Sequence, residues 1–254
     1  MIRSISVVYG IYLLLPIALL VVGSTGNSWT NTLLPTGLTS RWYVDLWQDP
    51  SFRRAFTTSL IVAASACVIN ALIAVPLAYS LYHGASRRGS IAAKIVSAMP
   101  IAVPTITLGF GYIIVFNTDT APWLGTLPLL IVAHAVHTLP YLTNTLLTDL
   151  RHLGLERLEN AAATLGASTW NQFTSIVVPN LRQSLISGLV MVAAISIGEF
   201  GLSNLLTSFQ NRTYPVVLLQ AFYGATGFAC AATVVLLVLA CTSAFTASTV
   251  AKKS

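Results

Sequence analysis

One acidic side chain, Glu199, stands inside a long apolar stretch, within the hexapeptide Ser-Ile-Gly-Glu-Phe-Gly at 196–201. A carboxylate at the centre of a membrane helix costs about 2.5–3.5 kcal/mol on insertion scales, so it must face a partner group, a cavity or water. Such a residue serves either as a gate or ion site on a transport path, or as a structural carboxylate hydrogen-bonded to backbone or to a neighbouring helix. The residue pattern leaves both roles open.

Two histidines, His134 and His137, are spaced three residues apart in another apolar stretch. On a helix this spacing places both imidazoles on one face, as a metal pair would require. No third ligand accompanies them, so we predict a buried, neutral, hydrogen-bonded pair and no metal site. The three cysteines, Cys67, Cys230 and Cys241, lie in apolar runs without paired spacing, and we expect them to be small packing residues.

The sequence contains no arrangement typical of an enzyme active site. It has no Gly-rich loop ending in Gly-Lys-Ser or Gly-Lys-Thr, and therefore no recognisable ATP site of its own. It also has no Ser-His-Asp set and no pair of carboxylates with supporting context. We expect a protein that is not an enzyme and holds no cofactor, and the net charge of +6 does not require a nucleic-acid partner.

Membrane helices must position these side chains, because the composition is far from that of soluble proteins. Of 254 residues, 55% are apolar and 8% are charged, against about 25% charged in soluble domains. Crossing a hydrocarbon layer takes about 20 helical residues, and the apolar runs do not alternate as barrel strands do. We predict an all-α integral membrane protein with one domain, residues 1–254, and six transmembrane helices: Ile5–Val22, Phe56–Tyr82, Ile91–Phe116, Leu127–Leu147, Leu185–Leu206 and Gly227–Val250.

The distribution of Lys and Arg predicts the orientation of these spans. With the N-terminus in the cytoplasm, the inner segments hold nine Lys and Arg residues and the outer segments hold four. Because cytoplasmic loops are enriched in basic residues, we predict that both termini are cytoplasmic. The first apolar run could be a cleaved signal peptide, but it is longer than the usual signal core of about 7–15 residues, which favours an uncleaved anchor.

The outer segment 24–54 carries Trp29, Trp42, Tyr43 and Trp47 among Gly, Pro and Thr. Indole rings favour the membrane–water boundary, so we predict an interfacial loop with a short amphipathic helix near Ser40–Gln48. The same segment is also suited to dock an external protein, and the two roles are compatible.

Two prolines, Pro100 and Pro104, interrupt the third apolar run. Prolines four residues apart remove two backbone donors from nearly the same helix face and bend the helix there. Such breaks are usually structural kinks, but broken helices also line transport paths. Pro100, Pro104 and Glu199 are therefore candidates for a translocation path or gate.

The inner loop 148–182 is the longest interruption of the apolar pattern in the later part of the chain. Apolar residues recur there at i, i+3, i+4 and i+7, which predicts a helix over Leu155–Leu165. Its thin apolar stripe consists of Leu158, Ala161, Ala162 and Leu165. Glu156 and Asn160 share a polar face, with Glu159 adjacent. Gly166 follows where a left-handed C-cap is expected.

A second short helix follows the glycine and ends at Pro179. Either Ser168 or Thr169 can cap it, and Thr169-x-x-Gln172 fits a capping box. Its apolar edge consists of Trp170, Phe173 and Val177. Such a unit is either a packed inner loop or a helix pair whose thin stripe lies in a groove of another protein.

This loop resembles the signature of type I ATP-binding-cassette importer permeases. The family pattern is Glu-Ala-Ala, three variable residues, Gly, nine variable residues and Ile-x-Leu-Pro. Here Asn160-Ala161-Ala162 precedes Gly166 at that spacing, and Ile176 to Pro179 ends the pattern. Asn160 stands where the family has Glu, and Val178 where it has Leu. Glu156 or Glu159 could supply the acidic contact instead.

The resemblance extends to the two prolines of the third run and to six spans with both ends inside. It implies the type I permease fold in a bacterial cytoplasmic (inner) membrane, surrounded by lipid. The implied partners are two cytoplasmic ATPase subunits, a second permease subunit, identical or homologous, and a periplasmic or lipid-anchored binding protein. The implied ATPase-coupling residues are Glu156, Glu159, Asn160, Ala161, Ala162, Gly166, Ile176 and Pro179.

The substrate class is less sharply indicated. The segment 196–201 resembles the fifth span of sulfate, molybdate and phosphonate permeases, and the outer segment from Trp29 to Tyr43 resembles the 2-aminoethylphosphonate branch. Iron, thiamine and polyamine permeases of the same architecture remain alternatives. A different class is a secondary transporter or channel driven by an ion gradient, with Glu199 as its ion or proton site.

Overall fold

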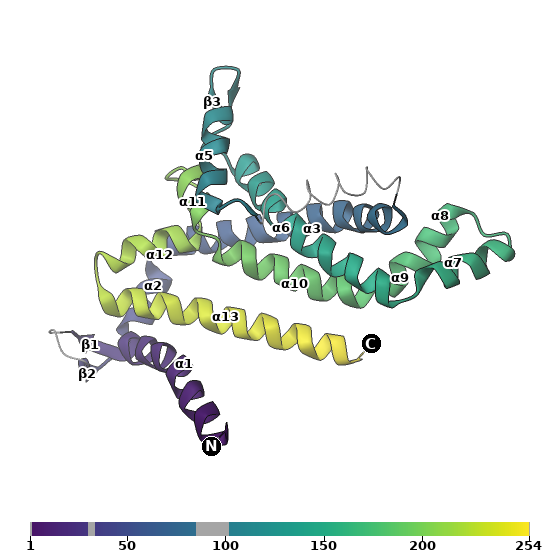
Figure 1. The fold of residues 1–254 in the computed structure, drawn as a ribbon. Helices are drawn as coiled ribbons and strands as arrows, with labels where there is room; N and C mark the ends of the chain where they lie inside the picture. The colour runs from purple at the N-terminus through teal and green to yellow at the C-terminus, as the bar shows by residue number, and fades with distance from the viewer. Residues whose placement is uncertain (1, 30–33, 85–101, 254) are drawn as a thin grey trace.

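Helices dominate the computed structural model, which describes residues 2–29, 34–84 and 102–253 (Figure 1). The first half of the chain forms α1 (Ile2–Thr25), β1 (Gly26–Ser28), β2 (Thr36–Leu38), α2 (Arg41–Gln48), α3 (Pro50–His83), α5 (Thr105–Phe116), β3 (Asn117–Thr118) and β4 (Ala121–Pro122). The second half forms α6 (Leu127–His152), α7 (Leu155–Thr164), α8 (Thr169–Gln172), the π-helical turn η1 (Phe173–Val177), α9 (Val178–Asn180), α10 (Arg182–Gly198), α11 (Gly201–Leu206), α12 (Tyr214–Phe222) and α13 (Thr226–Lys253).

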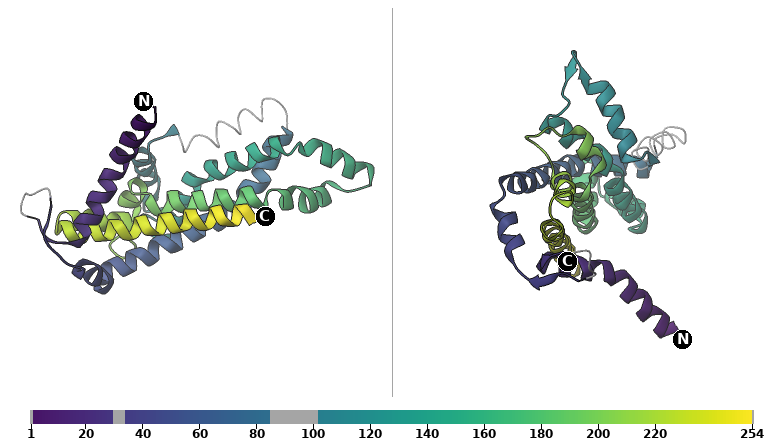
Figure 2. Two further views of the ribbon diagram at one scale, coloured as in Figure 1. Left: turned by 90° about the horizontal axis from the view of Figure 1, so that it is seen from below. Right: turned by 90° about the vertical axis from the view of Figure 1, so that its left-hand side faces the viewer.

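The core lies where α3, α6 and α10 pack against one another (Figures 1 and 2). Small residues of α3, including Ala74 and Ala78, are fully buried and let the helices approach closely, as is typical of helix pairs in membranes. Gly188 of α10 serves the same purpose, because a side chain there would collide with Leu142 of α6. The three helices therefore form one tightly packed unit.

The described helices agree with only part of the six-span prediction. By length and composition, Ile5–Thr25 and Pro50–His83 could each cross a membrane. A third candidate is the bent pair Thr169–Asn180 with Arg182–Gly198, whose axes differ by 64°. α5 and the described apolar part of α13 are shorter apolar helices. The count of six spans stays a prediction, in part because residues 85–101 lie outside the described chain.

The structure corrects the predicted fifth span, which was one continuous helix over Leu185–Leu206. α10 ends at Gly198, and Glu199 takes an extended conformation with φ −73° and ψ 119°. A separate helix, α11, begins at Gly201. The acidic residue therefore lies at a helix break and not within a helix.

Two parts of the chain project from the helical core (Figures 1 and 2). α1 points away from the bundle over its N-terminal part, and its residues 5–20 are all exposed or half-buried. α5 carries the short β3–β4 hairpin, in which Asn117 pairs with Pro122.

The outer segment folds back on the start of the chain. β1 and β2 form an antiparallel hairpin, with Gly26 opposite Leu38. The short helix expected near Ser40–Gln48 is confirmed as α2. The Trp42 Nε1–H donates to the Gly26 carbonyl at 2.7 Å, which ties α2 to the hairpin.

Candidate functional site

The inner loop projects beyond the packed core at one end of the molecule, where α7 and α8 lie (Figure 1). The predicted helix over Leu155–Leu165 is confirmed with its last residue one position earlier, as α7. Gly154 precedes α7 with φ +61°, and Gly166 follows it with φ +83°. Both values lie in the left-handed region that glycine adopts without steric cost, so two glycines set the direction of α7.

Gly166 closes α7 with the two hydrogen bonds of a Schellman motif. The Gly166 N–H donates to the Ala163 carbonyl at 3.0 Å, and the Ala167 N–H donates to the Ala162 carbonyl at 3.0 Å. The chain then turns into α8, whose N-cap is Ser168, because its Oγ accepts from the Asn171 N–H at 3.3 Å. Of the two predicted caps, Ser168 is therefore the one used.

The remainder of the loop differs from the prediction in two respects. The Gln172 side chain donates to the Ala167 carbonyl at 3.0 Å, so no capping box forms with Thr169. The helical path does not end at Pro179, because η1 and α9 carry it on to Asn180.

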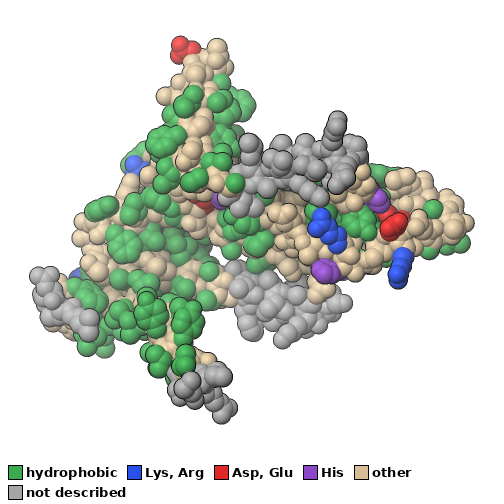
Figure 3. Space-filling model, viewed as in Figure 1, with side chains coloured by type: hydrophobic (Ala, Val, Ile, Leu, Met, Phe, Trp, Pro, Cys, Tyr) green, Lys and Arg blue, Asp and Glu red, His purple; other side chains and the backbone are tan. Residues whose placement is uncertain are grey.

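The predicted apolar stripe of α7 faces away from the chain's own core. Leu165 is 88% exposed and Leu158 is 41% exposed, Ala161 is exposed and Ala162 is half-buried. Trp170 of α8 is 70% exposed, whereas Val177 of the same predicted edge is fully buried. Charged and histidine side chains appear toward this end of the molecule (Figure 3). The loop thus presents apolar side chains on an otherwise polar projection.

The opposite face of α7 holds the loop to the core. Leu155 is fully buried in the apolar cluster of α3, α6 and α10, and one turn later Glu159 is only 6% exposed. The Tyr79 hydroxyl donates to Glu159 Oε1 at 2.8 Å, and His83 Nε2 lies 3.1 Å from Glu159 Oε2. Glu159 was expected to be an acidic contact for a partner, but its carboxylate is directed at α3.

Sequence reasoning missed Tyr79 and His83 as partners of the loop. Their spacing of four residues could have indicated a shared contact, because it places both side chains on one face at the end of α3. The other polar residues of α7, Glu156 and Asn160, are exposed, as predicted.

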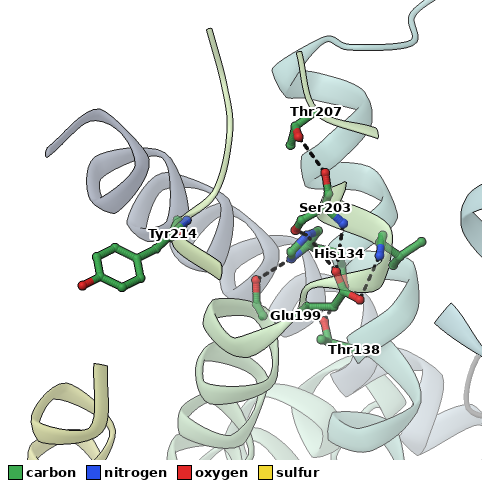
Figure 4. A network of polar contacts seen from close by, with 9 residues as sticks. His134, Thr138, Glu199, Ser203, Thr207 and Tyr214 are labelled. Carbon is green, nitrogen blue, oxygen red and sulfur yellow. Dashed lines mark hydrogen bonds and ion pairs between the residues drawn. The ribbon is translucent and has the colours of Figure 1, made fainter. Parts of the chain in front are cut away.

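A second polar cluster lies inside the helical core at the break between α10 and α11 (Figure 4). Glu199 is 7% exposed, and its two carboxylate oxygens accept from the Leu202 N–H at 2.9 Å and the Ser203 N–H at 3.0 Å. These amides belong to the first turn of α11, which has no intrahelical partners for them. The carboxylate therefore caps α11, which is the structural role that the sequence left open.

His134 of α6 holds the two sides of this break together (Figure 4). One ring nitrogen lies 2.8 Å from Ser196 Oγ at the end of α10, and the other lies 3.1 Å from Ser203 Oγ in α11. Glu199 Oε2 lies 3.9 Å from the second ring nitrogen. The prediction of a buried, hydrogen-bonded histidine is confirmed for His134, and the described residues contain no group of three or more His, Cys, Asp or Glu able to hold a metal ion.

The cluster continues from α6 to α3 through two further polar side chains. Thr138 donates to the His134 carbonyl at 2.7 Å, and Asn70 of α3 donates to Thr138 Oγ1 at 2.7 Å. Both residues are fully buried. A chain of hydrogen bonds thus joins α3 and α6 to the broken helix.

Of the two prolines, Pro104 occupies the N-cap position of α5, and Pro100 lies outside the described residues. α5 packs directly on α11. A side chain at Gly201 would collide with Thr105, and one at Gly109 would lie 2.6 Å from Leu205. Pro104, next to Thr105, and Glu199, two residues before Gly201, therefore both lie near the same end of this close helix contact.

Comparison with known protein families gives one match over most of the chain. The model described as "Binding-protein-dependent transport system inner membrane component" matches residues 74–252, a range that includes both the loop and the break at Glu199.

Three curated relatives carry names of transport permeases. A 2-aminoethylphosphonate transport system permease protein of Salmonella typhimurium is 26% identical over 84% of this chain and 79% of its own length. The sulfate transport system permease protein CysT of Escherichia coli is 27% identical, over 74% and 67%. The molybdenum transport system permease protein ModB of Azotobacter vinelandii is 32% identical, over 58% and 69%.

Solved structures share the fold at low sequence identity. A chain from a bacterial ABC transporter involved in the import of the acidic polysaccharide alginate has a TM-score of 0.79 and 15% identity, covering 98% of this chain and 92% of that one. A chain from that transporter in complex with a periplasmic protein that holds an alginate pentasaccharide has a TM-score of 0.76 and 16% identity, covering 97% and 91%.

Proposed function

The chain belongs to the family of binding-protein-dependent transport system inner membrane components, and from this premise we propose that it forms half of the translocation path of an ATP-driven importer. As an importer permease it is a transport subunit without an ATPase site of its own. Family membership favours this role over the alternative of a transporter driven by an ion gradient.

The observation that carries the proposal is the exposed apolar stripe of α7. Leu158, Ala161 and Leu165 are exposed on a helix whose other face is fixed by buried Leu155. A rigidly held helix with a thin, exposed apolar stripe is suited to a groove of a partner protein. In an importer the partner at this end is a cytoplasmic ATPase subunit, one for each of the two permeases.

The coupling contact is expected to use exposed polar residues beside that stripe. Asn160 occupies the position of the family's glutamate, and Glu156 lies one turn earlier on the same exposed face. Because Glu159 is occupied by α3, Glu156 is the residue of α7 placed to supply an acidic contact.

Lipid and a second permease subunit would cover the exposed surface of α1. Its apolar side chains are largely exposed along its length, for example Tyr12 at 72% and Leu14 at 62%. A permease subunit that forms only half of a path leaves such a surface for its partner and for the membrane. The outer segment around α2 faces away from the loop and is the surface on which a periplasmic or lipid-anchored binding protein would dock.

The substrate we propose is a small oxyanion, with a phosphonate such as 2-aminoethylphosphonate as the first choice. The three relatives named above carry phosphonate, sulfate and molybdenum in their names, and phosphonate, sulfate and molybdate are tetrahedral oxyanions. The alternatives are iron, thiamine or a polyamine.

We propose that Glu199 and Pro104 lie beside the gate of the path, where the contact between α5 and α11 would open and close. Pro100, which lies outside the described residues, stays a candidate for the same role. Glu199 acts there as a cap and not as a substrate ligand, because both its oxygens accept backbone N–H groups and its charge would repel an oxyanion.

Two measurements test the proposal. First, the chain purified from its own cells is expected to come out as one complex that contains ATPase subunits. Second, vesicles containing that complex are expected to take up labelled 2-aminoethylphosphonate, sulfate or molybdate only with ATP and the binding protein. Uptake that follows an ion gradient without ATP would contradict the proposal.

Replacing Leu165 by Glu is expected to reduce the amount of ATPase subunit that co-purifies by about tenfold, equivalent to ~1.4 kcal/mol of docking free energy. The side chain is 88% exposed, so the change should not unfold the chain. Leu38→Glu is the matched control, because Leu38 is 85% exposed in the outer hairpin, away from the loop. Equal ATPase recovery with both variants would contradict docking through the stripe.

A further inference from the structure

One buried carboxylate, Glu159, connects the projecting loop to a second long helix. α7 follows α6 directly in the chain, with only Leu153 and Gly154 between them. Motion of α7 therefore reaches α6 through the backbone. Among the described residues, its link to α3 is made by side chains, and Glu159 supplies the polar part of that link.

Hydrogen bonds and ring contacts together hold Glu159 of α7 against the end of α3. The Glu159 carboxylate lies within hydrogen-bond distance of the Tyr79 hydroxyl, at 2.8 Å, and of His83 Nε2, at 3.2 Å from Oε1 and 3.1 Å from Oε2. The tyrosine and histidine rings contact each other edge to face, with centroids 4.6 Å apart. Phe173 of η1 packs against Tyr79 from the loop side, with centroids 5.2 Å apart.

The hydrogen bonds of Glu159 fix the position of α7 relative to α3 in a way that apolar packing does not. Leu155 and Val177 are fully buried in the same cluster as α3, but the hydrophobic effect that holds them is non-directional. The buried Glu159 carboxylate is held by two partners on consecutive turns of α3, one of them the 44% exposed His83, so a shift of α7 along α3 loses hydrogen bonds to a largely buried charge.

We propose that Glu159 is a positioning residue that, with Tyr79 and His83, makes α7 and the end of α3 move as one body, so that ATPase motion received by α7 is transmitted to α3 as well as to α6. This inference rests on the proposed function and adds its transmission step. It also assigns Glu159 a role different from that of the exposed polar residues of α7, which contact the partner.

A matched control lies outside the loop. Asp119, in the turn between β3 and β4, carries the same charge as Glu159 and is exposed. Asp119→Asn therefore makes the same chemical change as Glu159→Gln, from a carboxylate to an amide, at a position that has no assigned contact with the ATPase. The variants Tyr79→Phe and His83→Gln remove the two partners of Glu159 separately.

The experiment uses the full complex of permease, ATPase subunits and binding protein in lipid vesicles. The measured quantity is the number of ATP molecules hydrolysed for each molecule of labelled 2-aminoethylphosphonate taken up, with sulfate and molybdate as parallel probes. A merely structural role would lower the amount of assembled complex but leave this ratio unchanged.

For Glu159→Gln we expect normal ATPase binding and a ratio raised about tenfold, because hydrolysis continues while α3 no longer follows α7. His83→Gln and Tyr79→Phe should raise the ratio less, and His83→Gln should add nothing in a Glu159→Gln background. Asp119→Asn should leave the ratio unchanged.

Different results overturn the transmission role of Glu159 and the proposed function of the chain. A ratio for Glu159→Gln equal to that of the wild type, in fully assembled complexes, overturns the transmission role and leaves the proposed function standing. Full additivity of His83→Gln and Glu159→Gln also overturns it. A wild-type chain that binds no ATPase subunit overturns the proposed function and, with it, this inference.

Discussion

Replacing Gly166 by Val is expected to lower uptake roughly 5- to 30-fold while the chain remains in the membrane. Gly166 has φ +83°, and a non-glycine residue in this region costs about 1–2 kcal/mol, most for a β-branched side chain. Outside the two adjacent residues, no described atom lies within 4 Å of the position that a Cβ would take, so the effect comes from backbone strain. A strain of 1–2 kcal/mol shifts a local equilibrium by a factor of about 5–30.

The strain acts on the residues proposed to bind the ATPase. Relaxing Gly166 would break the hydrogen bonds from the Gly166 and Ala167 N–H groups to the last turn of α7, and this would displace Leu165. Uptake and ATPase activity measured on the same vesicles check the result. Gly166→Asn is the control, because asparagine tolerates the left-handed region, and it should retain most uptake. Normal uptake by the valine variant at normal expression would contradict the coupling role of this turn.

The sequence was sufficient to predict the local form of this loop. The apolar period over Leu155–Leu165 and the glycine after it are properties of neighbouring residues, and α7 and its cap follow both. The apolar stripe was predicted for the same reason, but whether it packs within the chain or faces outward was left open. Helix periodicity and the hydrogen bonds of a helix cap depend on neighbouring residues, so they can be predicted without the rest of the fold.

The inward role of Glu159 could not be predicted from the same pattern. A carboxylate counts as polar in helical periodicity, so the pattern grouped Glu159 with the polar face of Glu156 and Asn160. Its partners, Tyr79 and His83, lie 80 and 76 residues earlier in the chain. Only tertiary packing, which places the end of α3 beside α7, makes this burial favourable.

The break at Glu199 was missed for a related reason. The residues from Leu185 to Leu206 are mostly apolar, and such a run reads as one helix. The break depends on the Glu199 carboxylate satisfying two backbone N–H groups and on His134, 65 residues earlier, bridging the two serines. The sequence identified the unusual residue and the need for a partner, but not the partner.

Replacing Glu199 by Gln is expected to lower uptake per assembled complex at least tenfold. The carboxylate accepts from both the Leu202 and Ser203 N–H groups, and a neutral amide can accept only through its single oxygen. The amide nitrogen would then face a backbone N–H, leaving a buried donor unsatisfied at a cost of about 1–3 kcal/mol. The start of α11 would shift, and with it the close contact of Gly201 with Thr105.

Uptake is measured relative to the amount of chain that co-purifies with ATPase subunits, so that a lower yield of protein is separated from a defect of the path. Ser203→Ala is the matched control, because it removes the hydroxyl near His134 but keeps the N–H that Glu199 accepts. If the cap is what matters, the serine variant keeps most of its uptake while Glu199→Gln does not. Equal uptake by Glu199→Gln and the wild type, per assembled complex, would show that the carboxylate only stabilises the fold. A loss of uptake in Ser203→Ala as large as in Glu199→Gln would show that the contact with His134, and not the cap, controls uptake.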